Sequence, residues 1–319
     1  MAPVRRLVPL LMAAVVLAGA TSGAGAQAVK TGDLAQLRQR ALELVNKVRS
    51  AHGLSKLTLD DRLNAIAQAH SADMLKKHYF AHVAPNGESP RDRFLAHGGS
   101  RWKLVAENIA KCTGCDVPPD IHRVEAFQTG WMHSPEHRRN ILTKGLEHFG
   151  FGIAGANGTV YADQDFSGPG TPHGTRPDET PKPVPAKNRS ERMAKSLAAE
   201  RKQAGVPPLK ADAALTKAAR NILGQSADGR LPGGSVDLLA ALPQDARGRW
   251  SSLRLLSAAC GGCGTTITDA DIRSFRKQWM DNPQFSKILS DGSVRDIGVA
   301  MDASGSGRKT AIAVLGVPR

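Results

Sequence analysis

Residues 127–142 read FQTGWMHSPEHRRNIL, and residues 275–290 read FRKQWMDNPQFSKILS. The two stretches share Phe, Trp, Met and Pro at a constant offset of 148 residues, and the same offset pairs Trp102 with Trp250 and Gly150 with Gly298. Agreement of rare and shape-determining residue types at one offset indicates an internal repeat. The sequence therefore predicts two copies of one domain.

Histidine distinguishes the two copies. The chain has 10 histidines, and all of them lie at or before His173. Imidazole is the side chain that titrates near neutral pH and the commonest metal ligand. Imidazole chemistry is therefore possible in the first copy and excluded from the second.

A proline-rich segment separates the copies. Six prolines lie between Gly168 and Asn188, a composition that favours extended, semi-rigid backbone over helix or sheet. We expect a linker over residues 169–188, with one domain at residues 34–168 and the other at residues 189–319.

The N-terminus has the features of an export signal. Arg5 and Arg6 precede an apolar run over residues 7–20, and small residues follow up to Ala28. This order predicts a signal peptide over residues 1–28. The run is too short to span a bilayer comfortably, and no later segment is apolar enough, so we expect no transmembrane segment. The predicted protein is secreted or periplasmic.

The chain is strongly basic, with a formal net charge of +14. Such a surplus favours anionic partners, such as envelope polymers or acidic lipids. Nucleic acid is disfavoured as a partner, because no compact Lys/Arg run with interleaved aromatic residues is present and the protein is predicted to be exported.

Each copy shows the same order of predicted elements: amphipathic helices first, then two strands joined by a glycine-containing turn. Asp120 and Thr268 are predicted caps of the third helix in each copy. Helices followed by strands favour an α+β layered domain. The helices are expected from Leu34 to Gly53, around residues 63–74 and after the two caps, and the strands at residues 149–154, 159–166, 297–302 and 309–316.

The first copy resembles the bacterial branch of the CAP superfamily, also called SCP-like extracellular proteins. The resemblance covers residues 34–168 and implies an α-β-α sandwich with a central cleft, so the fold predicted for the chain is two such sandwiches in tandem. The motifs that carry it are Asn46-x-x-Arg49, Tyr79-Phe80-Ala81-His82, Ala106-Glu107-Asn108-Ile109-Ala110, Gly130-Trp131-Met132-x-Ser134-Pro135-x-His137-Arg138-x-Asn140-Ile141-Leu142 and Gln164-Asp165-Phe166.

The same resemblance implies a cleft of two histidines and two acidic residues that can hold a divalent metal. By position, the histidines are His82 and His137 and one acidic residue is Glu107, whereas the second acidic position falls on Ser134. Neutral imidazoles suit zinc, copper or nickel, and a carboxylate can complete the ligand set. Two alternatives remain: Glu107 acts as a metal-free general base, or the histidines only tie loops together by hydrogen bonds.

In the second copy, Leu255 takes the place of Glu107 and Phe285 that of His137. This change predicts a stabilising role for the second copy, with an apolar ligand as the alternative. His70, near Ile66 and Met74, is predicted to be a hydrogen-bonded histidine at the core edge rather than a ligand.

The four cysteines occupy equivalent places in the two copies. In an exported protein the first expectation is disulfides. We predict one local disulfide in each copy, Cys112 with Cys115 and Cys260 with Cys263, with a bridge between copies as the alternative.

The leading functional hypothesis is a ligand-binding or interaction module in the cell envelope or outside the cell. The first alternative is a metal-dependent hydrolase of peptides or envelope polymers, which requires His82, His137 and Glu107 to converge and an oxyanion donor that no motif supplies. The second is an exported structural scaffold.

Overall fold

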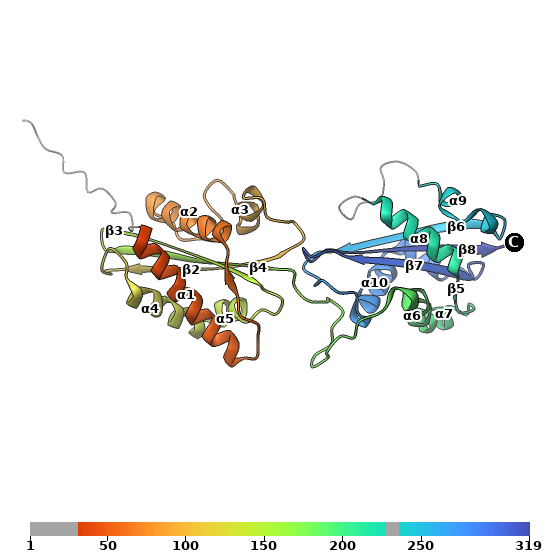
Figure 1. Cartoon of the computed structure of the whole chain (residues 1–319), viewed down its shortest axis with the longest axis horizontal. Coiled ribbons are helices and arrows are strands. Elements are labelled where there is room, and N and C mark those ends of the chain that lie inside the picture. Colours follow the sequence, from red (N-terminus) through yellow and green to blue (C-terminus); the bar gives the residue numbers. More distant parts are fainter. Residues whose placement is uncertain (1–30, 227–235) are drawn as a thin grey trace, which may run out of the picture.

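The computed structural model describes residues 31–226 and 236–319. The predicted signal peptide, residues 1–28, lies outside the described residues. The chain forms two units placed end to end, each with one sheet between two layers of helices (Figure 1). The α+β sandwich expected from the sequence is therefore confirmed.

The first unit has a four-stranded sheet in the order β1-β3-β4-β2, in which β1 is parallel to β3 and the other pairs are antiparallel. Helices α2 and α3 cover one face, and α1, α4 and α5 cover the other (Figure 1). The elements are α1 Thr31–Ala51, β1 Thr58–Leu59, α2 Asp61–Lys77, α3 Pro90–Ala96, β2 Leu104–Thr113, α4 Ile121–His133, α5 Pro135–Ile141, β3 His148–Ala156 and β4 Thr159–Gly168.

Side-chain caps define where these helices begin. Asp60 accepts a hydrogen bond from the Leu63 amide at the start of α2, and Asp120 accepts one from the Arg123 amide at the start of α4, as predicted. Such caps satisfy amides that have no partner within the helix. At the other end of the sheet, Asn157 and Gly158 both have positive φ and form the tight turn between β3 and β4. These local signals fix the boundaries that the sequence predicted.

Glycine in β3 sets the distance between α2 and the sheet. A Cβ atom on Gly150 would lie 2.2 Å from the backbone carbon of Leu63, and one on Gly152 would lie 2.2 Å from that of Ala67. No side chain fits in that space, so the helix backbone packs directly on the strand. This close approach places the polar residues of α2 against the middle of the sheet.

The second unit repeats this topology with strand order β5-β7-β8-β6. Its first helix is broken at Leu197 into α6 and α7, where the sequence predicted one helix. The elements are η1 Ala186–Asn188, α6 Arg189–Ser196, α7 Ala198–Gln203, β5 Lys210–Ala211, α8 Ala213–Gln225, α9 Leu238–Ala241, η2 Gln244–Ala246, β6 Trp250–Cys260, α10 Asp269–Asp281, α11 Pro283–Leu289, β7 Asp296–Ala303 and β8 Lys309–Pro318.

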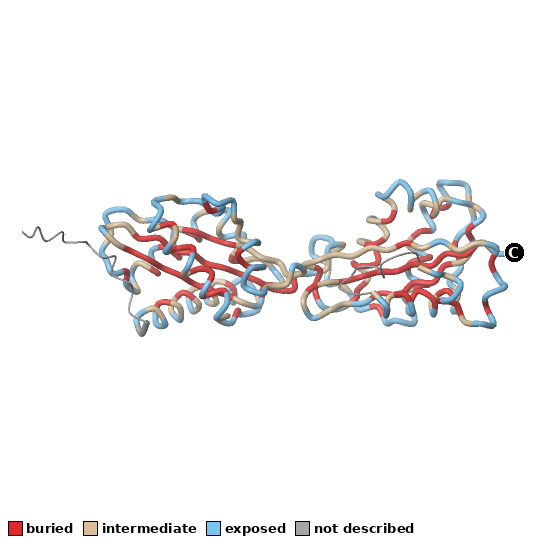
Figure 2. The backbone as a smooth tube through the Cα atoms, turned by 90° about the horizontal axis from the view of Figure 1, so that it is seen from above, coloured by how far each residue is buried: buried red, intermediate tan, exposed pale blue. Residues whose placement is uncertain are grey.

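The proline-rich segment packs along the second unit. The Lys182 amide donates to Asp269 Oδ1 (2.9 Å) and the Val184 amide to the Ile267 carbonyl (2.9 Å), and the Val184 side chain is buried in the core of that unit. At the junction of the two units, the Gly262 amide donates to the Trp102 carbonyl (2.6 Å). The buried strands run through each unit, and the backbone trace narrows between the two units (Figure 2).

In both predicted local pairs, the two cysteines lie at disulfide distance from each other. Cys112 is bonded to Cys115 at the end of β2, and Cys260 to Cys263 at the end of β6. This arrangement favours the local pairing over a bridge between copies. Each disulfide closes a short loop that leads from the edge strand of its sheet towards the following helix, α4 or α10.

Candidate functional site

The predicted cleft residues gather around β2, which is the edge strand of the first sheet. Glu107 lies in the middle of β2, His82 follows α2 on one side of the sheet, and His137 lies in the first turn of α5 on the other side. Ser134 lies between α4 and α5 and occupies the N-cap position of α5, but its hydroxyl makes no capping hydrogen bond. The four residues thus come from four different segments of the chain.

His82 and Glu107 are in direct contact. His82 Nδ1 lies 2.7 Å from Glu107 Oε1, and the Glu107 side chain is 2% exposed whereas that of His82 is 49% exposed. The imidazole is therefore held at one edge by a buried carboxylate and open to solvent at the other. A histidine oriented in this way can bind a ligand or a metal through its free nitrogen.

Arg93 of α3 holds the other side of Glu107. Its Nη2 donates to Glu107 Oε2 and to the carbonyl of His82 (3.1 Å). The guanidinium thus fixes both the carboxylate and the backbone of the histidine that contacts it. Both oxygens of Glu107 thus have a partner, and the carboxylate is held in a fixed position.

His137 is the less solvated of the two cleft histidines. Its Nδ1 is buried and has no hydrogen-bond partner among the described residues. Burial, together with the nearby charge of His82, lowers the pKa of His137 from its ordinary value. The imidazole is therefore neutral at neutral pH, the form in which it can ligate a metal or accept a hydrogen bond.

A chain of amides fixes α5 against β2. Asn140 Nδ2 donates to the Glu107 carbonyl (3.0 Å) and to Asn108 Oδ1 (2.9 Å), and Asn108 Nδ2 donates to the His137 carbonyl (3.2 Å). Gln164 of β4 continues the chain by accepting from Asn108. These residues belong to the motifs that carried the resemblance, and the structure gives them a positioning role.

A second group of polar residues lies beside Glu107, in the layer between the sheet and α2. Asp163 and Asp165 of β4 point to the same face as Glu107, and β4 pairs with β2 so that Asp165 stands opposite Glu107. Both aspartates are buried, and three of their four carboxylate oxygens have no hydrogen-bond partner among the described residues. Burial, followed by the charge of neighbouring carboxylates, raises the pKa of both well above the ordinary value.

His70 of α2 completes this group. It is 2% exposed and therefore lies in the core, in agreement with the prediction of a histidine at the core edge. Its Nε2 lies 3.1 Å from the Ala81 carbonyl and its Nδ1 3.3 Å from the Tyr79 hydroxyl. The sequence prediction did not single out Asp163 or its neighbourhood with His70. The two-residue period of β4 was the available signal, because it puts Asp163 and Asp165 on one face.

Two groups of described residues bring at least three metal-ligand atoms within 4.8 Å of one another. One is His70, Glu107 and Asp163, and the other is His173, Cys260 and Cys263, whose sulfurs are joined in a disulfide. The pair predicted from the sequence, His82 and His137, is in neither group. Metal binding by His82 and His137 therefore stays a prediction.

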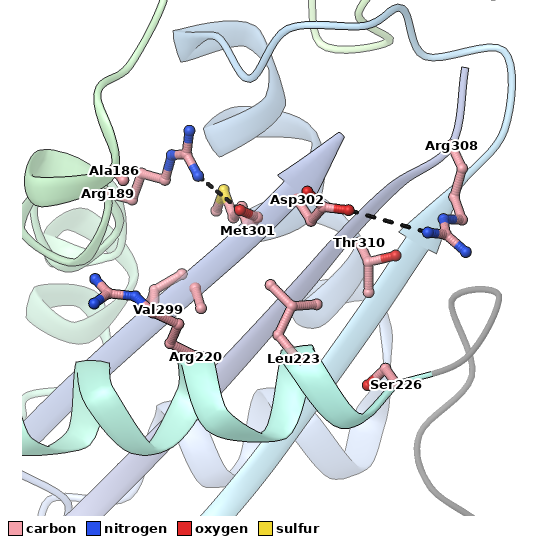
Figure 3. A pocket seen from close by; sticks show the side chains of 12 residues that line it. Ala186, Arg189, Arg220, Leu223, Ser226, Val299, Met301, Asp302, Arg308 and Thr310 are labelled. Atoms are coloured by element: carbon pink, nitrogen blue, oxygen red, sulfur yellow. Dashed lines mark hydrogen bonds and ion pairs between the residues drawn. The ribbon is translucent and has the colours of Figure 1, made fainter. Parts of the chain in front are cut away.

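The second unit has a pocket of about 480 Å³ beside α8 and the strands β7 and β8. Arg189, Arg220 and Arg308 line it together with Asp302 and Met301 (Figure 3). The Arg189 guanidinium donates to the Met301 carbonyl (2.6 Å), and Arg308 lies 4.0 Å from Asp302. This lining is rich in arginine, and the pocket is not at the place of Leu255 and Phe285, so the apolar ligand predicted as an alternative stays a prediction.

An α-β-α sandwich with a histidine and a carboxylate at its edge strand defines the class of the first unit. Residues 42–166 match the family model described as CAP, the cysteine-rich secretory protein family. These residues thus resemble the family that the sequence motifs had indicated. The second unit lies outside the matched residues, and its description as a degenerate CAP copy stays a prediction.

The curated relatives match part of the chain. An uncharacterized protein, YkwD, of Bacillus subtilis is 36% identical over 126 residues, which are 40% of this chain and 45% of that protein. An uncharacterized membrane protein, YlbC, of the same organism is 34% identical over 36% of this chain and 31% of its own length. The chain thus spans less than half the length of these curated relatives.

Among solved structures, an extracellular protein containing an SCP domain from Bacillus anthracis is similar to this chain. The similarity covers 44% of this chain and 44% of the chain in that structure. The identity is 28% and the TM-score 0.35. In the part of the chain that the structure describes, no helix combines the length and the apolarity that crossing a bilayer requires.

Proposed function

We propose that the chain is an exported binding module whose first domain recognises its ligand at the edge of β2, through His82, Glu107, Ser134 and His137. The contact that carries the proposal is His82 against Glu107. A half-exposed imidazole is fixed by a buried carboxylate that is itself held by Arg93. A histidine with a purely structural role does not require one edge of its ring to be exposed to solvent. This arrangement therefore supports recognition of a ligand from solvent.

The proposed place of action is the cell envelope or the outside of the cell. It is supported by the sequence features of an export signal and by the two disulfides, which persist in oxidising compartments. The net charge of +14 supports anionic partners such as envelope polymers or acidic lipids. A divalent metal such as zinc, held by His82 and His137, is the proposed cofactor of this cleft.

The hydrolase alternative has less support. Within residues 31–226 and 236–319, both oxygens of Glu107 already have cationic or imidazole partners, so the carboxylate is not free to take a proton from water. Its activation would require displacement of Arg93 or His82. Binding uses the same residues without that step.

The test is co-sedimentation of the mature chain with purified peptidoglycan and with vesicles of phosphatidylglycerol. We expect binding to at least one of them to fall about tenfold or more in His82→Ala/His137→Ala. His122→Ala is the matched control, because its side chain is 89% exposed and lies outside the site. Equal binding by all three proteins would contradict the proposal, and turnover of peptidoglycan that depends on Glu107 would replace it with the hydrolase.

A further inference from the structure

The contacts of Asp163 and Asp165, the two buried aspartates beside the cleft, do not balance their negative charge. Asp163 is fully buried with both carboxylate oxygens unpartnered, and Asp165 is 2% exposed with Oδ2 unpartnered. An isolated buried carboxylate is costly, and such groups are normally hydrogen-bonded, paired with a cation or bound to a metal. The contacts within the described chain do not meet that requirement for Asp163.

The nearby positive charge is already paired with another carboxylate. Arg93 is the cation that faces this group, and it is paired with Glu107, so the two cancel. Asp163 and Asp165 therefore leave two negative charges to be neutralised, by two protons or by one dication.

The hydrogen bonds of His70 suit a metal ligand. The Tyr79 hydroxyl donates to Asp73 Oδ2 (2.8 Å), so towards His70 Nδ1 it can only accept, and the Ala81 carbonyl near Nε2 can also only accept. A neutral imidazole has one N–H and can satisfy one of these two acceptors. The other nitrogen keeps a lone pair while the ring stays oriented by its N–H, which is the usual state of a metal-bound histidine.

The second copy shows that the fold does not need polar residues here. The sheet register makes Leu255, Ile312 and Val314 the equivalents of Glu107, Asp163 and Asp165, and the position in the helix makes Ile222 the equivalent of His70. The three β-branched residues belong to one apolar cluster, against which Leu255 packs. In the first copy, the polar group divides the same layer into two small apolar clusters.

We propose that His70, Glu107 and Asp163 form a buried site for a divalent transition metal, with Asp165 as the adjacent balancing charge. Their ligand atoms lie within 4.8 Å of one another. A dication bound at about 2.0–2.2 Å needs them roughly 3.5 Å apart, so small side-chain rotations close the site. One imidazole with two carboxylates suits zinc, manganese or iron(II) rather than the all-oxygen preference of magnesium and calcium.

This site is distinct from the cleft above it and goes beyond the proposed function, although the two share Glu107. Of the Glu107 oxygens, Oε1 contacts His82 and Oε2 contacts Arg93. A metal held below would therefore fix the carboxylate that orients the exposed histidine. The site needs neither His82 nor His137, so the two ideas can fail separately.

The experiment is a zinc chloride titration of the full mature chain after treatment with chelator, followed by calorimetry and by thermal unfolding. We expect the buried site to bind one equivalent of zinc per chain, counted apart from any zinc that His82 and His137 hold in the cleft, and to raise the Tm. Asp163→Asn, which keeps the shape of the side chain, should weaken zinc binding by roughly 100-fold or more and abolish the Tm increase. Magnesium chloride should give neither effect.

Two further variants make the outcome decisive. His82→Ala/His137→Ala should keep stoichiometric zinc if the buried site is real, and loss of zinc in that variant alone would overturn the site in favour of the cleft. His70→Gln repeats the test in case Asp163→Asn does not fold. Absence of zinc binding in the wild type, or unchanged affinity in both Asp163→Asn and His70→Gln, would also overturn the proposal, while the co-sedimentation test of the cleft would still stand.

Discussion

The two copies share a scaffold and fill the same space in opposite ways. Under α2, the first copy places His70, Glu107 and two aspartates, whereas under α8 the second copy places Ile222, Leu255, Ile312 and Val314 at the equivalent positions. Strand order and glycine-mediated helix packing are the same in both. The comparison distinguishes residues that the fold requires from residues that it does not require. The buried polar group of the first copy is of the second kind.

The scaffold itself is held by equivalent residues. Arg49 and Arg201 are both almost fully buried. Arg49 donates to the Ile141 carbonyl (2.7 Å), and Arg201 donates to the equivalent Leu289 carbonyl (2.6 Å). Each guanidinium satisfies carbonyls at the end of a short helix, where no intrahelical partner exists. These arginines serve the fold in both copies, unlike the histidines.

The largest effect is expected from the buried ion pair of the second copy. Lys309 Nζ lies 2.7 Å from Asp271 Oδ2, and both side chains are buried, whereas the first copy has Val160 at the position of Lys309. Lys309→Met leaves a buried carboxylate without its counter-charge and should cost about 3–5 kcal/mol in the free energy of unfolding. Urea unfolding of the variant and of the wild type measures this loss of stability.

The control for that prediction is Lys309→Met/Asp271→Asn. The asparagine still accepts from the Thr268 amide but carries no charge, so most of the lost stability should return. A single variant that costs less than about 1 kcal/mol would show that the pair is not a stability determinant of the second copy.

The next effect tests whether the two copies pack alike. Gly150→Ala and Gly298→Ala each place a Cβ atom within about 2.2 Å of a helix backbone, at Leu63 or Leu215. Each should cost about 1–3 kcal/mol by forcing the helix away from the sheet. Gly130→Ala in α4 is the matched control, because nothing lies within 4 Å of its Cβ position, and it should be neutral or stabilising. Unequal losses in thermal unfolding would break the equivalence of the copies.

A third prediction concerns pH in the metal-free protein. Because burial raises the pKa of Asp163 in the folded state, stability is full below the unfolded pKa of about 3.9 and is lost as pH rises towards the folded pKa. Asp163→Asn removes the part of this dependence that Asp163 contributes, whereas Asp165, whose pKa is also raised by burial, keeps its own part. With chelator present, the variant should match the wild type near pH 4 and exceed it by about 1–3 kcal/mol at neutral pH. A constant difference across pH would contradict the assignment.

The smallest effect on stability is expected at His82. Its side chain is 49% exposed, so the contact with Glu107 is screened by solvent, and His82→Ala should change the free energy of unfolding by less than about 1 kcal/mol. Ligand binding should fall nonetheless. A large loss of stability measured by urea unfolding would instead make His82 a structural residue.

Much of the fold could be predicted from the sequence, because its signals are local. The caps Asp120 and Thr268, the Asn157-Gly158 turn and the two cysteine pairs each act within a few residues. The strands β2 and β6 were missed, although Glu107 lies in one of them. In β2, a mixture of polar and apolar residues obscures the two-residue alternation, because one face meets the buried polar group and the other meets α5.

The site was predicted in part for a similar reason. The resemblance supplied His82, Glu107 and His137, and the structure confirms the contact between the first two. Arg93 and Asp163 were missed because their roles depend on strand pairing and on the docking of α3, which bring together residues far apart in sequence. No spacing rule in the sequence links His70 to Asp163.

The most direct test of the account is hydrogen–deuterium exchange of the full mature chain with and without zinc chloride. The account predicts slower exchange in the first copy, at α2, β2 and β4, and no change in the equivalent α8, β6 and β8. Equal protection of both copies, or no protection in the first, would contradict the claim that the first copy carries the binding function and the second repeats only its scaffold.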